Sequence, residues 1–469
     1  RHRVRLPVPA LRHRFFARKA RPVVAGRIAV HEAREGPLQI TAQSAHRLGV
    51  ASRKHRRLPG VGRAEKEGQI DTVTGPVVSV GRGRPVKAHL PDLAARVGRR
   101  FGKLSSNFTA VLSVLSLFCL TSSQIGASGA VINALIPSIP LNVCLLLAGF
   151  VTIFYTTFGG MIADQVSDLI QFGIILVGLA IATPIVLKYA GGWQAISAAL
   201  PGEKLNMTQI GWASIIGYFF NYFCTFLCGP EMVSRFETCK DEKTAVRASF
   251  LCAILMAAMS IFPTLLGLAA FALKDQLPGL AENGSNAMMV VTGAYAPGVV
   301  TGLISAAIIC ATMSSADSNL LCMSTMIIND IYPGFGGKKK LDDKQTIFYT
   351  RLCNVIAALI AMGISMFGVS LVAMNTFAFG IRCAGPFAAY GLGLAVPKAT
   401  KNSGMISIFT GTIAFVVWQL LSNGGTLWFM MPVVFGSLVS VITFYAVNLI
   451  EWKRGVPAAP SAYAVEEAK

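Results

Sequence analysis

The chain has 469 residues, of which 53% are hydrophobic and 14% charged, and its mean hydropathy is +0.57. This balance excludes an ordinary soluble globular protein and is typical of a protein that crosses a membrane several times. The net charge of +20 is unevenly distributed, because residues 1–100 hold 23 of the 42 Lys and Arg but only 6 of the 22 acids. The sequence therefore divides near residue 100 into a basic segment and an apolar one.

The basic segment, residues 1–90, shows no helical or strand periodicity and no run long enough to span a membrane. Its composition fits three interpretations: a nucleic-acid-binding arm, a transit peptide, or GC-rich DNA translated out of frame. We favour the third, because the chain starts at Arg1, the first hundred residues lack Met, Cys, Trp, Tyr and Asn, and the composition changes abruptly near Leu90. No nucleic-acid partner is therefore expected.

The apolar part, residues 91–455, predicts about ten membrane-spanning helices, each near the ~20 residues that a bilayer requires. The predicted spans are 107–136, 141–163, 165–188, 209–230, 244–273, 298–330, 346–372, 375–396, 404–423 and 428–450. Alternate connections are rich in Lys and Arg, which predicts that they and the C-terminal tail at 456–469 are cytoplasmic. The fold class predicted is an all-α polytopic membrane protein of the cytoplasmic membrane.

The run from Gly298 to Tyr332 carries the most informative pattern. Ala311, Ser314, Ser315 and Ser318 recur at the spacing i, i+3, i+4, i+7, which places them on one helical face. Such a face can serve close helix packing, or its hydroxyl and carbonyl oxygens can bind a cation. Asp317 lies in the same apolar run, and a carboxylate within a membrane usually faces protein, water or an ion. The pattern therefore favours an ion site over packing.

Further polar residues stand at the start of the third predicted span. Asp164 and Asp168 are one helical turn apart, and Gln171 follows three positions later. We interpret Asp164 as an exposed acid in the first turn of its helix, where the helix dipole favours it. Asp168 and Gln171 lie deeper and are expected to face the interior of the bundle.

Arg382 is the one arginine deep within a predicted span, and we expect it to pair with a buried acid rather than bind an anionic substrate or extend to the surface. Glu231, next to Pro230, is expected at a cytoplasmic helix end. No phosphate-binding loop, GxSxG, HExxH or zinc-ligand spacing occurs, so nothing in the sequence favours an enzyme or a cofactor.

Three stretches resemble the sodium:solute symporter family, the group of the sodium/proline, sodium/galactose and sodium/sialic acid transporters. FGGMIADQVSDLIQ resembles the GG-x7-D-x2-Q start of a core helix of the family. CATMSSADSNLLCMSTMIINDIY resembles its sodium-site helix, and GPEMVSRF resembles its Pro-x4-Arg-Phe motif. The likeness covers residues 90–455, with the three motifs in the family's order.

The resemblance implies an inverted-repeat fold of five plus five core helices, with sites near the bilayer midplane. By position, the Ala311 carbonyl, Ser314 and Ser315 match one sodium site of the family. Asp168, Ser314 and Ser318 match a second site, found in some members, with Asp317 where others have serine. The implied function is sodium-coupled secondary active uptake of a small organic solute by alternating access, with sodium as the coupling ion.

Family members have about three more helices before the one at 107–136, and one of these supplies the other half of the sodium site. The resemblance therefore predicts a fold that lacks its first helices and a polypeptide that by itself does not transport. Two alternatives stay open: a proton-coupled carrier that uses Asp168 and Asp317, and a membrane sensor or scaffold without transport. The sequence specifies neither the solute nor the oligomeric state.

Overall fold

The structure is a computed structural model that describes residues 93–460, apart from gaps at 203–205, 207, 238, 282–283, 285, 335–340 and 394. The basic segment predicted at 1–90 and most of the tail predicted at 456–469 lie outside the described residues. Within them the chain is helical, with one isolated β-bridge between Leu427 and Met430 and no strand.

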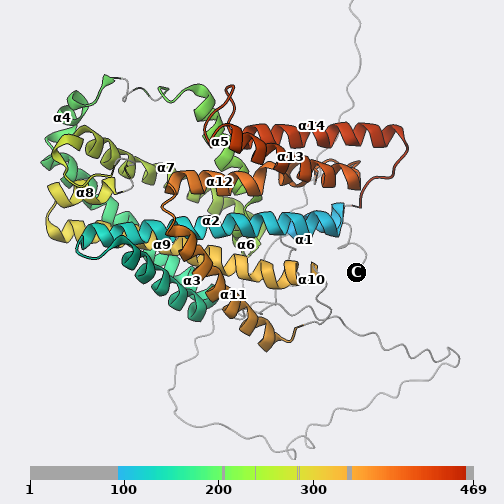
Figure 1. Cartoon of the computed structure of the whole chain (residues 1–469), viewed down its shortest axis with the longest axis horizontal. Helices are drawn as coiled ribbons and strands as arrows, with labels where there is room; N and C mark the ends of the chain where they lie inside the picture. The colour runs from blue at the N-terminus through green and yellow to red at the C-terminus, as the bar shows by residue number, and fades with distance from the viewer. Residues whose placement is uncertain are drawn as a thin grey trace, which may run out of the picture. The chain divides into compact units, whose positions relative to one another are not determined.

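The helices follow one another along the chain, and most of them run through a single bundle (Figure 1). Their bounds are α1 Leu93–Phe101, α2 Lys103–Leu135, α3 Leu141–Tyr189, α4 Gly192–Ala199, α5 Trp212–Cys228, α6 Pro230–Glu237, α7 Glu242–Ala272, η3 Lys274–Gln276, α8 Ala287–Tyr295, α9 Gly298–Met326, η4 Ile327–Ile331, α10 Tyr332–Gly334, α11 Asp343–Ser365, α12 Leu371–Ala384, η5 Ala388–Leu392, α13 Lys401–Leu421 and α14 Pro432–Lys453.

Among the described residues, eight helical segments are long and apolar enough to cross a membrane. They correspond to eight of the ten predicted spans, so the prediction of an all-α polytopic membrane protein is confirmed. The other two predicted spans are shorter in the structure, with 17 residues in α5 and 14 in α12. At about 1.5 Å per residue, these two helices fall short of a hydrocarbon core about 30 Å thick.

Both short helices end where the sequence interrupts helical hydrogen bonding. α5 stops at Cys228, before Gly229 and Pro230, and α6 starts anew at Pro230. α12 stops at Ala384, two residues before Pro386, and the π-helical turn η5 follows at Ala388–Leu392. Proline has no N–H to donate to the preceding turn, so a helix readily ends ahead of it. At these two of the ten predicted positions the structure therefore has interrupted helices in place of single long ones.

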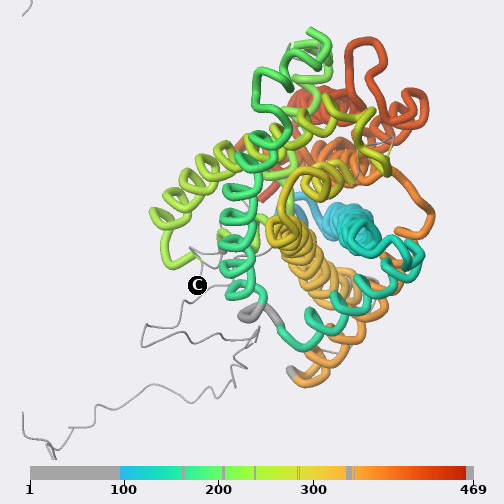
Figure 2. Tube along the Cα trace, turned by 90° about the vertical axis from the view of Figure 1, so that its left-hand side faces the viewer, coloured from blue at the N-terminus to red at the C-terminus, as the bar shows by residue number. Residues whose placement is uncertain are grey.

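α3 differs from the prediction in another way. We predicted two helices separated near residue 164, but the structure has one continuous helix of 49 residues that contains both spans. The spans Leu141–Gly159 and Asp164–Tyr189 run in different directions in the bundle (Figure 2). Asp164 is the first residue of the second span and so stands at this change of direction.

α2 forms the centre of the bundle. It packs against α3, α9, α11 and α12, and in Figure 2 it is seen nearly end-on with α9 beside it. In the most apolar 18-residue stretch of α2, 67% of the residues are buried, whereas in the corresponding stretch of α7 only 6% are buried. α7 therefore lies at the periphery, whereas α2 and α9 build the core that positions the acidic side chains described below.

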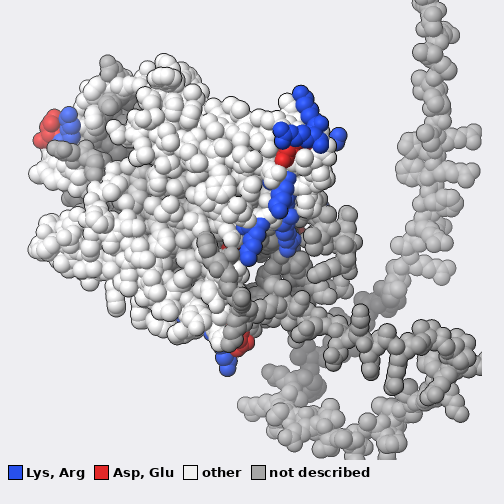
Figure 3. Space-filling model, turned by 45° about the vertical axis from the view of Figure 1, so that its right-hand side comes forward, with Lys and Arg blue, Asp and Glu red and all other residues white. Residues whose placement is uncertain are grey.

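The surface of the bundle is largely uncharged. In Figure 3, Lys, Arg, Asp and Glu gather at the margins of the face in view, with a broad uncharged area between them. Large apolar side chains such as Phe154, Phe219 and Ile442 are exposed on the outer helices. An exposed apolar belt of this kind is what contact with lipid tails requires.

Candidate cation site

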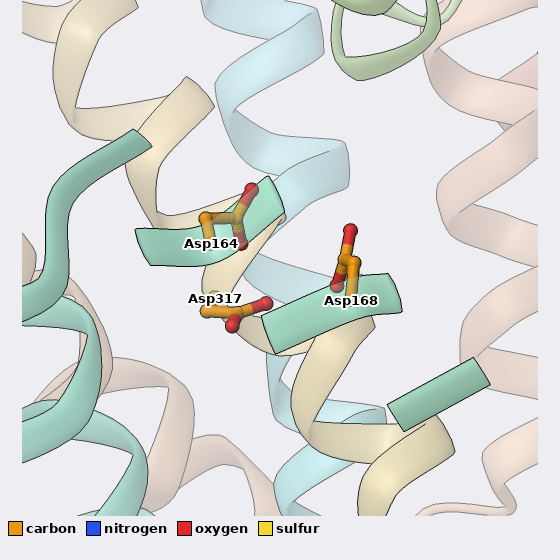
Figure 4. A group of neighbouring side chains, drawn as sticks. All are labelled: Asp164, Asp168 and Asp317. Carbon is orange, nitrogen blue, oxygen red and sulfur yellow. The ribbon is translucent and has the colours of Figure 1, made fainter. Parts of the chain in front are cut away.

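Three carboxylates from two helices lie together inside the bundle. Asp164 and Asp168 are four residues apart on α3, which puts them on one face, and Asp317 comes from the adjacent α9. One carboxylate oxygen from each residue lies within 4.8 Å of the others. Figure 4 shows the three side chains around one space between the helices. This is the geometry of a candidate cation site.

Asp317 is the most deeply buried member of the group, with an exposed fraction of 1%. Its Oδ1 accepts a hydrogen bond from the backbone N–H of Ser318 at 2.8 Å. Its Oδ2 is buried and has no hydrogen-bond partner among the described residues. A carboxylate oxygen without a partner at such a position is costly, unless a cation or a proton neutralises it.

Ser318 and Arg235 complete the polar cluster. The Ser318 hydroxyl lies 3.3 Å from both carboxylate oxygens of Asp164, to which it can donate. Arg235, on α6, donates from Nη2 to Ser318 Oγ at 2.8 Å and to Asp168 Oδ2 at 2.9 Å. Among the described residues, three carboxylates and one hydroxyl thus surround one guanidinium, so acidic groups outnumber basic ones in the described part of the cluster.

The space beside Asp164 and Asp317 is narrow. It is a crevice with no room for a water-sized sphere, and its lining residues are Tyr155, Thr156, Gly159, Asp164, Asp317 and Leu321. The Tyr155 hydroxyl also makes a close hydrogen bond with Ser167, which ties the two spans of α3 together at this point. A ligand between the carboxylates would thus contact protein oxygens directly.

The donor atoms are all oxygens, from carboxylates and a hydroxyl. Hard cations such as sodium, calcium and magnesium prefer oxygen ligands, whereas zinc and copper sites usually include nitrogen or sulfur. The cluster therefore suits a hard cation.

The structure brings together three of the six predicted ion-site residues. Asp168, Ser318 and Asp317 meet in this cluster, across a separation of about 150 positions in the chain. Ala311, Ser314 and Ser315 lie about one to two turns away on α9, where the two serine hydroxyls each donate to the Ala311 carbonyl at 3.2 Å. Their assignment to a sodium site stays a prediction.

The interpretation of Asp164 was wrong. We expected an exposed acid in a first helical turn, but Asp164 has an exposed fraction of only 9% and stands within the continuous helix α3. Because α3 does not begin there, the position offers no free helix N-terminus to stabilise the charge. The spacing of four residues to Asp168 was the signal that could have placed it on the inward face.

The prediction that Arg382 pairs with a buried acid is confirmed. Its partner is Glu231, in the first turn of α6, and the pair is bidentate, with both N–O distances at 2.7 Å. The exposed fraction of the Arg382 side chain is 0% and that of Glu231 is 10%. This ion pair joins the broken α5–α6 junction to the end of α12.

Comparison with known proteins identifies the family. The family model "Sodium:solute symporter family" matches residues 87–411. Two curated relatives are a sodium/proline symporter of Staphylococcus aureus, 28% identical over 326 residues, and one of its strain bovine RF122, 27% identical over 326 residues. Each alignment covers 66% of this chain, and the chain spans only about 62–63% of the length of these relatives.

One solved structure has a similar fold. It is described as a substrate-bound outward-open state of a Na⁺-coupled sialic acid symporter that reveals a novel Na⁺ site. The TM-score is 0.62 at 22% sequence identity, and the match covers 79% of this chain and 78% of the other. At this identity the likeness establishes the fold alone. The family and these relatives are transporters rather than enzymes. From the family match and the shared fold, the chain belongs to the sodium:solute symporter family.

Proposed function

We propose that this chain serves sodium-coupled secondary active uptake of a small organic solute by alternating access in the cytoplasmic membrane, and that by itself it binds the coupling ion. The observation that carries the proposal is the buried Oδ2 of Asp317, which has no hydrogen-bond partner among the described residues, in a side chain grouped with Asp164 and Asp168. Membership in the sodium:solute symporter family supports sodium as the coupling ion.

The energetics favour a bound cation over a purely structural role for the acids. One carboxylate near the middle of a membrane costs about 2.5–3.5 kcal/mol on insertion scales, and here three stand together. The attraction between a monovalent cation and a carboxylate is several-fold stronger in this setting than in bulk water, because it scales inversely with the dielectric constant. A cation among the three acids would therefore offset a cost that packing alone does not.

We assign two candidate positions to sodium. One is the predicted second site of Asp168, Ser314 and Ser318 with Asp317, to which we add Asp164 because its carboxylate oxygens lie 3.3 Å from the Ser318 hydroxyl. The other is formed by the carbonyl of Ala311 and the hydroxyls of Ser314 and Ser315. Broken helices often surround such sites in secondary transporters. Here α6, which follows the α5–α6 break, contacts the first position through the hydrogen bond from Arg235 to Ser318.

The solute is a small organic molecule, and the curated relatives make L-proline the first compound to test.

We place the C-terminus in the cytoplasm, because alternate connections between the spans are rich in Lys and Arg. The alternative of a proton-coupled carrier is supported by the same observation, because the Oδ2 of Asp317, which has no hydrogen-bond partner in the described part of the chain, could bind a proton in place of a metal ion.

Thermal unfolding in different cations tests the proposal. We expect sodium to raise the unfolding temperature of the purified full-length chain, because a ligand that binds only the folded state stabilises it by about 2.7 kcal/mol at 100 times its Kd. Potassium and choline at equal ionic strength serve as controls and should have little effect. L-proline should add a further rise only when sodium is present, since coupling between two sites is reciprocal.

The other outcomes separate the alternatives. Stabilisation that follows acidification and ignores sodium would select the proton-coupled carrier. An unfolding temperature that responds to neither sodium nor pH would overturn the transport proposal and favour a sensor or scaffold.

A further inference from the structure

Arg235 connects the short helix α6 to the acidic cluster. α6 begins at Pro230, directly after the break at Gly229, and packs against α9. From this helix the Arg235 side chain extends to α3 and α9, where Nη2 contacts Asp168 Oδ2 at 2.9 Å and Ser318 Oγ at 2.8 Å. One guanidinium nitrogen therefore uses its two N–H bonds on oxygens from two different helices.

These two oxygens are among those that the proposed cation would use. A guanidinium and a metal ion cannot occupy the same lone pairs of Asp168 and Ser318 together, and each neutralises the same negative charge. Ser318 also links Arg235 to Asp164, because its hydroxyl contacts the carboxylate of Asp164. In the structure, Arg235 thus stands where a coupling cation would compete with it.

The two ends of α6 are held with unequal strength. At its start, Glu231 forms the buried bidentate pair with Arg382, whose side chain has an exposed fraction of 0%. Further along, the Arg235 side chain is 50% exposed and its partner Asp168 is 20% exposed. An exposed ion pair is held weakly, whereas separating a buried one leaves an uncompensated charge. Of these two ion pairs, the one that Arg235 makes is therefore the more easily separated.

We propose that Arg235 acts as a tethered counter-cation, which occupies Asp168 and Ser318 when the coupling ion is absent and is displaced when the ion binds. Displacement removes this link between α6 and the helices α3 and α9, while the Glu231–Arg382 pair keeps the start of α6 in place. Ion occupancy is thereby linked to the position of a helix segment that follows the break in α5–α6. The inference rests on the sodium site proposed above.

Direct binding of ²²Na⁺ to the full-length chain in lipid nanodiscs tests the inference. Arg235→Gln removes the competing charge and keeps a polar, uncharged side chain that can donate hydrogen bonds. We expect this variant to bind sodium about 5-fold more tightly or better, within the usual range of coupling between two sites. Arg235→Lys keeps the charge but replaces the planar guanidinium fork with a compact ammonium, and it should have an affinity between those of Arg235→Gln and the wild type.

Arg247→Gln is the matched control, since Arg247 is an exposed basic residue on α7 in the region that follows α6, and its affinity should equal that of the wild type. A purely structural role for Arg235 predicts the opposite sign, because loss of a structural contact would weaken binding. Equal or weaker sodium binding by Arg235→Gln, or by Arg235→Lys if the first variant does not fold, would overturn the inference. Absence of saturable ²²Na⁺ binding by the wild type would instead refute the proposed sodium site.

Discussion

Replacing Asp317 with asparagine is expected to raise the unfolding temperature of the sodium-free protein and to abolish the further rise that sodium produces. The first effect follows because the substitution removes a carboxylate that is 1% exposed and has one oxygen without a hydrogen-bond partner in the part of the chain that the structure describes. The second follows because the amide carries no charge to hold the cation. The two effects have opposite signs, which a general loss of folding would not produce.

The stabilisation that sodium gives to the wild type is the reference for the expected loss in Asp317→Asn. At a sodium concentration 100 times the Kd, the wild type should gain about 2.7 kcal/mol and the Asp317→Asn variant close to none. Thermal unfolding with and without sodium measures both values. Asp275→Asn is the control, because Asp275 is an exposed acid in the turn after α7, and it should behave as the wild type does. If sodium raises the unfolding temperature of Asp317→Asn as much as that of the wild type, the prediction is wrong, and the ion binds instead at Ala311, Ser314 and Ser315.

Removing the carboxylate of Glu231 is expected to be the most destabilising single change in the described part of the chain. Glu231→Ala leaves the Arg382 guanidinium buried without its bidentate partner. Breaking a buried pair in this way costs about 3–5 kcal/mol. The double variant Glu231→Leu with Arg382→Met should recover much of this loss, since two apolar side chains need no charge compensation.

The unfolding temperature can be followed with a thiol-reactive dye, because Cys224, Cys228 and Cys383 are buried beside this ion pair and become reactive on unfolding. Arg454→Met serves as the control, as Arg454 is an exposed residue at the end of α14. Glu231→Ala with the same unfolding temperature as the wild type, or a double variant less stable than Glu231→Ala, would contradict this interpretation of the pair.

The membrane helices could be predicted from the sequence because their signal is local. A run of about 20 apolar residues identifies a span without knowledge of its neighbours, and eight such segments are found at the predicted places. The prediction missed two helix interruptions, because a Gly or Pro signal was present in the sequence but the apolar run around it was long enough for a full span. Gly229 and Pro230 end α5, and Pro386 follows the end of α12, yet both stretches were long enough to be taken as full spans.

The site was only partly predictable, because its contacts join distant parts of the chain. Hydroxyl spacing and an intramembrane acid pointed to Ser318 and Asp317, but no local pattern shows that Asp164 lies beside them. The partner of Arg382 is likewise 151 positions away. In the sequence, Arg235 stood out only as part of the GPEMVSRF motif and of a basic connection. Its contacts with Asp168 and Ser318 could not be predicted, because they depend on where the structure places α6 relative to α3 and α9.

Saturable binding of ²²Na⁺ to the full-length chain in nanodiscs is the most direct measurement of a cation site among Asp164, Asp168 and Asp317. The wild type should bind ²²Na⁺ saturably, unlabelled sodium should displace it, and potassium at the same concentration should not. A variant with all three residues changed to asparagine should lose this binding while it still elutes as a single folded species. Saturable binding that persists unchanged in the triple variant, or its absence from the wild type, would show that these carboxylates do not form the sodium site.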